Sequence, residues 1–408
     1  MAGALAVAAL MLSFAPPHSI GPWWLLALLG ILAVVWVGTQ PAATVRDDML
    51  PALAVVLAAL GLAVVARLSP ALAQKQQIWL LFSLLLAIVL GPPFTRFRRF
   101  AAYKYLWVIA SLVLFVLLLA FGQEVNGARL WIRIGPVQYE PIELIKLFIV
   151  LFLAAYLAEM ADVIANARPW SLQANLKYLG PLFIGWGASM AILIVQHDLG
   201  MATLLLATFA TLLFVATRRA DIVALGALIF AGGAYWASRH FAYVHTRIAI
   251  WQNPFADPLG AGYQSSQAYY ALAAGGIFGT GFRLGHPTFI PDVATDYVYA
   301  AISEEFGLIG AAIVLAIFIG LVRRILAAGL EQPDLYAKLL AVGLATTLGV
   351  QVFIIVGGVV GLFPLTGITL PFISYGGSSL VANFLLVALA WAMSSRPVSR
   401  RAGAQSSE

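Results

Sequence analysis

The chain has 408 residues, of which 62% are hydrophobic and only 10% are charged, and it contains no cysteine. A soluble domain needs a charged surface, so this composition excludes a soluble globular protein and favours a protein that exposes apolar side chains to lipid. The lack of cysteine excludes disulfides and cysteine-based metal sites. The net charge of +6 does not indicate nucleic-acid binding, because the basic residues are scattered between apolar runs.

Apolar runs long enough to cross a bilayer follow one another along the chain. We expect spans at 21–38, 50–67, 77–93, 104–122, 140–160, 177–195, 199–216, 220–237, 298–322, 338–363 and 379–395. The stretch from Met1 to Phe14 is apolar but short, and it lacks the charged start and the cleavage site of a signal peptide. The expected fold class is therefore an all-α, polytopic transmembrane helical bundle, which ends in a disordered cytoplasmic tail at 397–408.

Basic residues in the short loops predict the orientation, because Lys and Arg are retained on the cytoplasmic side. With both chain ends inside, fifteen of the 23 Lys and Arg residues fall in cytoplasmic segments, seven fall in outer segments and Lys146 lies within a span. This orientation leaves one large extracytoplasmic loop, at 238–297. Its aromatic residues, such as Trp251 and Tyr269, indicate an ordered loop with a function.

Glu143 and Lys146 are the first candidates for chemistry, because ionisable groups within a span are costly. They lie three residues apart on the helix that follows Pro141, so they can pair on one face. Lys146 is expected roughly 10 Å below the outer end of this helix. The pair is either a buried structural ion pair or part of a polar cavity that opens to the outer leaflet.

The segment before this helix, 126–132, combines Arg129 with Trp131 and a flexible Asn-Gly turn. Arg129 is either an interfacial anchor or a guanidinium that holds a phosphate through paired hydrogen bonds.

The large loop ends at Asp296, directly before a long apolar helix. One interpretation is a carboxylate that caps the helix or lies in its first turn. The other is a base held at the membrane surface. Glu304 and Glu305 follow two turns later on different helix faces, so we expect them to be packing or loop-tethering partners. His240 and His245 do not share a helix face and have no third ligand, so a histidine metal site is not expected.

Six stretches in order along the chain resemble the SEDS family (shape, elongation, division and sporulation), the RodA, FtsW and SpoVE type of cell-wall polymerase. The six are Asn126 to Ile132, Glu140 to Lys146, Gln196 to Gly200, Gly262 to Gln267, Thr295 to Gly307 and Leu370 to Ser379. Two residues depart from the usual family pattern: Glu140 stands where glutamine is usual, and His197 where proline is usual.

The resemblance implies a ten-span core at 46–396, preceded at 1–45 by one or two extra N-terminal spans. It implies a glycosyltransferase that joins lipid II units into peptidoglycan strands at the outer face of the bacterial cytoplasmic (inner) membrane, during cell elongation or division. The implied partners are lipid II, membrane lipid and a class B penicillin-binding protein.

In the family, the aspartate that matches Asp296 is the favoured catalytic residue. The substrate-binding residues implied by the matching motifs are Arg129, Glu143, Lys146, Asp198, Gln267 and Ser378. The departing pyrophosphate needs a positive charge, which Arg129, Lys146 or a divalent cation (Mg²⁺ or Mn²⁺) would supply.

Two other functions belong to different classes. A lipid II flippase would also need a charged cavity, but it should show inverted repeats and broken helices, and the sequence shows neither. A non-catalytic scaffold would need the loop 238–297 but not the carboxylate of Asp296.

Overall fold

The computed structural model describes residues 44–125, 128–135, 137–166, 180, 187 and 198–397. Within these residues, eight helices are long and apolar enough to cross a membrane, and a shorter apolar helix, α14 (Gly377–Met393), follows them. They confirm the expected all-α membrane bundle. The expected spans at 21–38 and 177–195, the apolar start at 1–14 and the tail at 397–408 lie wholly or mostly outside the described residues.

The long helices follow the apolar runs of the sequence. They are α3 (Met49–Leu68), α4 (Pro70–Phe94), α5 (Lys104–Phe121) preceded by the 3-10 turn η1 (Phe97–Tyr103), α6 (Ile142–Asn166), α8 (Leu199–Thr217), α9 (Ala220–His240), α12 (Val298–Leu330) and α13 (Leu335–Val359). Two of them begin at an aspartate cap. Asp198 accepts a hydrogen bond from Met201 N at the start of α8, and Asp334 accepts one from Ala337 N at the start of α13.

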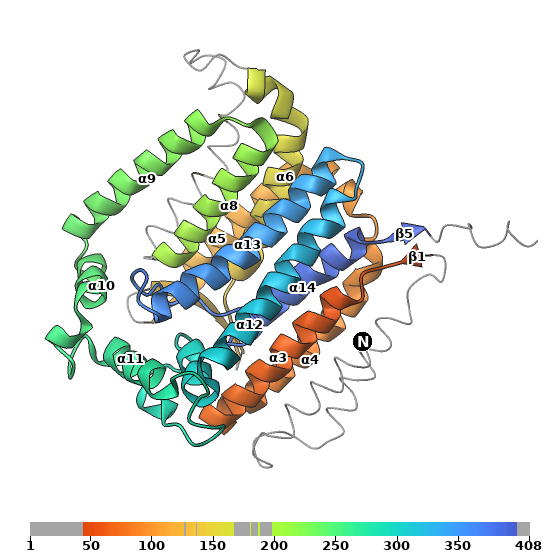
Figure 1. Cartoon of the computed structure of the whole chain (residues 1–408). Helices are drawn as coiled ribbons and strands as arrows, with labels where there is room; N and C mark the ends of the chain where they lie inside the picture. Colours follow the sequence, from red (N-terminus) through yellow and green to blue (C-terminus); the bar gives the residue numbers. More distant parts are fainter. Residues whose placement is uncertain are drawn as a thin grey trace, which may run out of the picture.

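Helices α12, α13 and α14 connect the rest of the bundle. Helix α14 packs on α4, α12 packs on α3, and α13 packs on α6, α8 and α12. Helix α9 stands apart at one side of the bundle (Figure 1), where its main contacts are with its chain neighbours α8 and α10 (Ala242–Gln252). Of the residues of α9, only Ala237 is buried within the part of the chain that the structure describes.

The large loop is ordered, as expected. Besides α10 it contains η2 (Pro254–Ala256), α11 (Tyr263–Gly275) and η3 (Pro287–Phe289). The ring of Phe255 packs between Tyr269 and Tyr270, at centroid distances of 6.2 and 5.8 Å. These aromatic contacts hold η2 against α11, although Phe255 and Tyr270 remain about half exposed.

A small antiparallel sheet lies between α5 and α6, where the sequence predicted only a loop. Its strands are β2 (Gly122–Val125), β3 (Ala128–Ile134) and β4 (Val137–Tyr139), in that order. A second, two-stranded pairing joins β1 (Thr44–Val45) to β5 (Arg396–Pro397).

Glycine at position 307 lets the large loop dock on α12. Gly307 has a φ of +67°, and a Cβ there would lie 2.3 Å from Gly279 N. The backbone of Gly281 donates to Glu305 O at 3.0 Å, on the same part of the helix. Only a residue without a side chain fits this close approach, so the helix and the loop meet backbone to backbone.

Glu304 and Glu305 tether the loop, as predicted. Glu304 Oε1 accepts a hydrogen bond from His286 N at 2.7 Å. The Glu305 carboxylate accepts a backbone hydrogen bond from Arg283 of the loop, and its Oε1 lies 3.2 Å from Arg67 Nε at the end of α3.

The segment 360–376, which we call the α13–α14 loop, turns back into the bundle. A Cβ at Gly61 of α3 would lie 2.5 Å from Ile373 Cα, so the loop rests directly on the α3 backbone. Gln76 of α4 donates to Ser374 O at 3.1 Å and accepts from Gly376 N at 3.2 Å. Two spanning helices therefore fix the height of this loop.

Ion pairs join the helix ends that the charge bias assigns to one side. Arg324 pairs with Asp47 and Arg98 with Asp334, both at 2.8 Å, at the end predicted to be cytoplasmic. Arg67 and Glu305 pair at the opposite end, where the large loop lies. The helix ends are thus grouped as the predicted topology requires.

Candidate active site

Asp296 lies two residues before α12, close to the predicted position. The capping residue of this helix is Tyr297, its side chain makes no cap hydrogen bond, and the first turn of α12 contains no acidic residue. The interpretation of Asp296 as a capping or first-turn carboxylate is therefore wrong. Its backbone N–H instead donates to Asp292 O at 3.0 Å in a tight turn.

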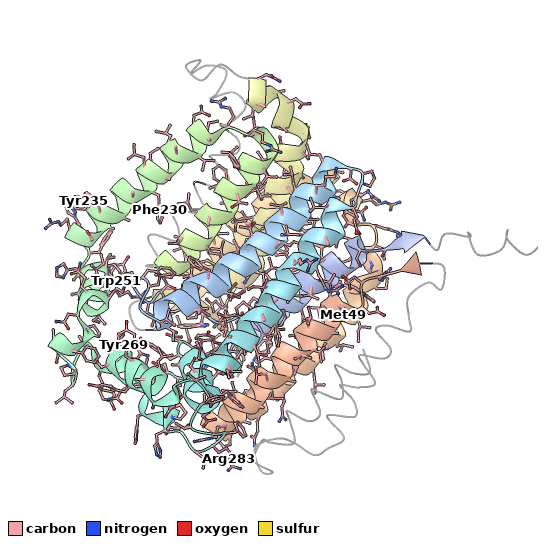
Figure 2. All side chains as sticks on the ribbon, viewed as in Figure 1. Met49, Phe230, Tyr235, Trp251, Tyr269 and Arg283 are labelled. Carbon is pink, nitrogen blue, oxygen red and sulfur yellow. The ribbon has the colours of Figure 1, made fainter. Side chains whose placement is uncertain are left out.

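The side chain of Asp296 lines a cavity of about 200 Å³ at the end of the bundle that carries the large loop. The walls come from α10, α11, the end of α13, the α13–α14 loop and the segments directly before α11 and α12: Arg247, Ile250, Trp251, Ala261, Gln264, Ser265, Tyr269, Tyr297, Gly358, Phe363, Leu365 and Gly367. Figure 2 shows Trp251 on α10 and Tyr269 on α11, at this end of the molecule. Trp251 Nε1 donates to Gly361 O at 2.9 Å, which ties α10 to the α13–α14 loop.

Arg247 and Asp296 approach the same point of this cavity. A Cβ at Gly367 would lie 3.6 Å from Asp296 Oδ2 and 4.0 Å from Arg247 Nη2. Arg247 is held by the α13–α14 loop, because its Nη1 donates to Thr366 O at 3.0 Å. Gly367, with a φ of +78°, thus leaves room beside both side chains.

Sequence reasoning missed Arg247 as a site residue. It is one of a few basic residues in a segment assigned to the outer side, where the charge bias disfavours them. A basic residue on the expected outer side was the only signal in the sequence that pointed to Arg247.

The electrostatic environment turns Asp296 into a stronger base than an ordinary aspartate. Burial raises the pKa of Asp296 to about 6, against smaller lowering effects of the Thr295 hydrogen bond and the Arg247 charge. Burial also raises the pKa of Tyr297 to about 12, so its hydroxyl, 2.9 Å from Ser265 Oγ, stays protonated. The cavity therefore holds a carboxylate, a guanidinium and a neutral phenol.

Other carboxylates lie in the same electrostatic neighbourhood. Burial raises the pKa of Asp198 to about 6, although the charge of Arg247 acts to lower this pKa. Burial, followed by the charges of Glu143 and Asp198, raises the pKa of Glu140 well above its usual range, and Asp296 adds to this effect. The α6 start, the α8 cap and the Asp296 turn are thus close enough to influence one another.

Glu143 and Lys146 form the predicted ion pair on α6, and both side chains are buried. Lys146 Nζ also donates to Gln351 Oε1 of α13 at 2.8 Å, and Gln351 Nε2 donates to Thr369 O at 2.9 Å. Because α6 begins at Ile142, Lys146 lies only about 6 Å along the helix, so the expected depth of roughly 10 Å was too large.

The remaining predicted substrate-binding residues are placed differently. Ser378 Oγ accepts a hydrogen bond from Glu140 N at 2.8 Å, and Asp198 caps α8. Gln267 of α11 does not line the Asp296 cavity, whereas its neighbour Gln264 does. The backbone of Arg129 lies in β3, but its side chain is outside the described part of the structure.

A metal cluster is not found among the residues that the structure describes, since no three His, Asp or Glu side chains gather there. A magnesium ion that takes most of its ligands from substrate phosphates and water needs only one or two carboxylates. Asp296 is the carboxylate that would hold it, and the divalent cation stays a prediction.

A helical membrane bundle with a carboxylate and a guanidinium together in a cavity at one end indicates a class of protein, the integral-membrane enzymes. Comparison with known proteins supports this class. Residues 47–396 match the family model of FtsW, RodA and SpoVE, described as a cell cycle protein. The chain therefore belongs to the SEDS family, and it is a peptidoglycan glycosyltransferase with several membrane spans.

Individual relatives cover most of the chain. The peptidoglycan glycosyltransferase RodA of Mycobacterium tuberculosis is 35% identical over 389 residues, which cover 90% of this chain and 83% of the relative. The stage V sporulation protein E of Bacillus subtilis is 39% identical over 288 residues, which cover 70% and 76%.

Among solved structures, a chain of a peptidoglycan synthase complex has 32% identity and a TM-score of 0.70. RodA of Thermus thermophilus has 28% identity and a TM-score of 0.60. Each covers 85% of this chain over 96% of its own length. These relatives support the enzyme over the flippase and the scaffold.

Proposed function

We propose that this glycosyltransferase polymerises lipid II at the outer face of the bacterial cytoplasmic membrane, with Asp296 as general base. The observation that carries the proposal is the juxtaposition of Asp296 and Arg247 in one cavity at the end of the bundle that the charge bias assigns to the outside. Lipid-linked sugars lie at this level of a membrane.

Glycan extension requires a sugar hydroxyl to attack the anomeric carbon that carries the polyprenyl pyrophosphate. The new carbon–oxygen bond forms as the bond to the pyrophosphate oxygen breaks, and Asp296 takes the hydroxyl proton. A base is most effective when its pKa lies near the working pH, and Asp296, with a pKa of about 6, is mostly ionised at neutral pH and still basic.

Arg247 is better placed than Lys146 to stabilise the departing pyrophosphate. The charge of Lys146 is already paired with Glu143, whereas no ion pair of Arg247 occurs among the described residues. A guanidinium also binds phosphate oxygens through two parallel hydrogen bonds. We assign Glu143, Lys146, Asp198 and Ser378 to the support of this site, and Gln267 to a substrate contact outside the Asp296 cavity, while Arg129 stays a predicted substrate-binding residue.

The partner that we propose is a class B penicillin-binding protein, which would crosslink the strands that this enzyme makes. The similarity to a chain of a peptidoglycan synthase complex supports this choice.

The test is a polymerisation assay with the purified chain, its partner transpeptidase and labelled lipid II, with products resolved by length. Asp296→Asn should lower the rate by about 100-fold or more, because the base is lost while the size is kept. Arg247→Gln should also lower the rate, and Arg247→Lys should restore only part of it.

Asp292→Asn is the matched control. Asp292 is exposed, does not line the cavity, and has a φ of +50°, which asparagine tolerates. This variant should keep nearly the full rate. If folded, partner-bound Asp296→Asn polymerises lipid II as fast as the control, Asp296 is not the base.

A further inference from the structure

A second cavity, of about 490 Å³, lies at the other end of the bundle, where α4 ends and α5 begins. Its walls include Pro92, Pro93, Arg96, Arg99, Leu106 and Trp107. Arg98, between the two lining arginines, is paired with Asp334 at the end of the molecule predicted to be cytoplasmic. This cavity is therefore separate from the Asp296 site.

Arg96 and Arg99 are the charged residues of this cavity. Both side chains are exposed, and neither has an ion pair or a side-chain hydrogen bond to another described residue. The intervening Arg98, in contrast, donates to both Asp334 and Gln332. Two guanidinium groups thus face the same space, and no acidic side chain of the described residues pairs with either of them.

Apolar stripes continue from this cavity along both helices. On α4, Phe82, Leu85 and Val89 are 48, 50 and 59% exposed, and Val89 lies one turn before Pro93. On α5, Leu106, Ile109 and Val113 are 55, 53 and 50% exposed, at helical spacing from the cavity. In a bilayer these stripes lie against hydrocarbon.

We propose that this cavity binds the headgroup of an anionic phospholipid of the cytoplasmic leaflet. Arg96 and Arg99 hold the phosphate, and the acyl chains lie along the stripes of α4 and α5. Only a lipid offers an anion and hydrocarbon chains at this one depth, and basic pockets between spans on the cytoplasmic side favour such headgroups. The aromatic side chains of Tyr103 and Trp107 suit the same interfacial level.

The bound lipid would support the packing of α5 on α6. Trp107 lines the cavity and also packs on Phe148 of α6, with ring centroids 5.4 Å apart. Phe148 lies two residues after Lys146. A ligand that binds only the folded state raises the unfolding temperature, so this lipid should stabilise the protein.

The test uses the full chain in detergent, titrated with palmitoyl-oleoyl phosphatidylglycerol or with the zwitterionic phosphatidylcholine of the same chains. Lipid retention is measured by native mass spectrometry and the unfolding temperature by intrinsic fluorescence. Phosphatidylglycerol should be retained and should raise the unfolding temperature, whereas phosphatidylcholine should do neither. In Arg96→Gln/Arg99→Gln, the apparent affinity for phosphatidylglycerol should fall about tenfold or more.

The matched control is Arg218→Gln/Arg323→Gln, which removes two exposed arginines from the same predicted side but not from the cavity. It should bind phosphatidylglycerol as the unchanged protein does. If the first pair does not fold, Arg96→Lys/Arg99→Lys takes its place and should bind more weakly. Equal losses in the cavity and control variants, or equal binding of both lipids, would overturn the proposal, as would tighter binding of undecaprenyl phosphate in the same cavity.

Discussion

The surroundings of Asp296 make it a stronger base than an aspartate in water. Its pKa is about 6, so the carboxyl group keeps its proton up to a higher pH. Burial is the largest cause, and the nearby charge of Asp292 adds to it. The Thr295 hydrogen bond and, to a smaller extent, the Arg247 charge work in the opposite direction and lower the pKa. These opposed effects leave the pKa of Asp296 at about 6.

The polymerisation rate should therefore rise with pH and level off above about pH 6, because only the ionised carboxylate accepts the proton. Removing the Asp292 charge lowers the pKa of Asp296, so Asp292→Asn should shift the midpoint to lower pH and leave the plateau rate unchanged. Initial rates of lipid II consumption between about pH 5 and 8 measure both. A midpoint that Asp292→Asn shifts upward would contradict the assignment.

Glu143 and Lys146 should depend on each other, because removing one partner leaves an uncompensated buried charge, which typically costs about 3–5 kcal/mol. Lys146→Met should lower the folded yield more than Glu143→Gln/Lys146→Met does. Thermal unfolding and polymerisation are measured for both single variants and the double variant. A double variant that folds well but stays inactive would assign the pair to substrate binding, and additive losses would show that the residues are not coupled.

At the scale of elements, the apolar runs predicted the described spanning helices to within a few residues at most ends. Helix α12 runs to Leu330 rather than 322, because it continues past Arg323 and Arg324, the charged residues directly after the expected end. The β2–β3–β4 sheet was missed although Asn126-Gly127 before an alternating strand is a hairpin signal. The cavity was not predictable, because Arg247, Asp296 and Gly367 come from three segments that only the tertiary fold brings together.

Gln351 links three of these elements, α6, α13 and the α13–α14 loop, through its bonds to Lys146 and Thr369. Gln351→Leu keeps the approximate size and removes both bonds, leaving buried partners unsatisfied at about 1–3 kcal/mol each. The unfolding temperature and kcat should both fall. Thr208→Val at the neighbouring α8–α13 contact is the control, and it should lower the unfolding temperature only. Unchanged kcat in Gln351→Leu would limit Gln351 to a packing role.

Over the whole molecule, the basic-residue bias and the positions of the helix ends divide the bundle into the same two ends. One end carries the ion pairs of Arg98 and Arg324 with their acidic partners, and the large loop covers the other end. Which end faces the cytoplasm follows from the basic residues alone.

Cysteine labelling tests this orientation on a clean background, because the chain has no cysteine of its own. Leu259→Cys, at a site 90% exposed in the large loop, should react with a membrane-impermeant maleimide in intact spheroplasts. Ala220→Cys, at the exposed start of α9, should react only after lysis. The reverse pattern would invert the topology and place the Asp296 cavity inside the cell.

The contact between Gly61 of α3 and the α13–α14 loop also affects the turn that carries Asp296. A methyl group at position 61 would press on Ile373, whose neighbour Ser374 donates its hydroxyl to Thr295 O, one residue from Asp296. The small residue at position 61 therefore fixes how closely the α13–α14 loop, and with it the Asp296 turn, approaches α3. Genetic selections for altered wall synthesis should therefore return changes at position 61, on a helix that does not line the Asp296 cavity.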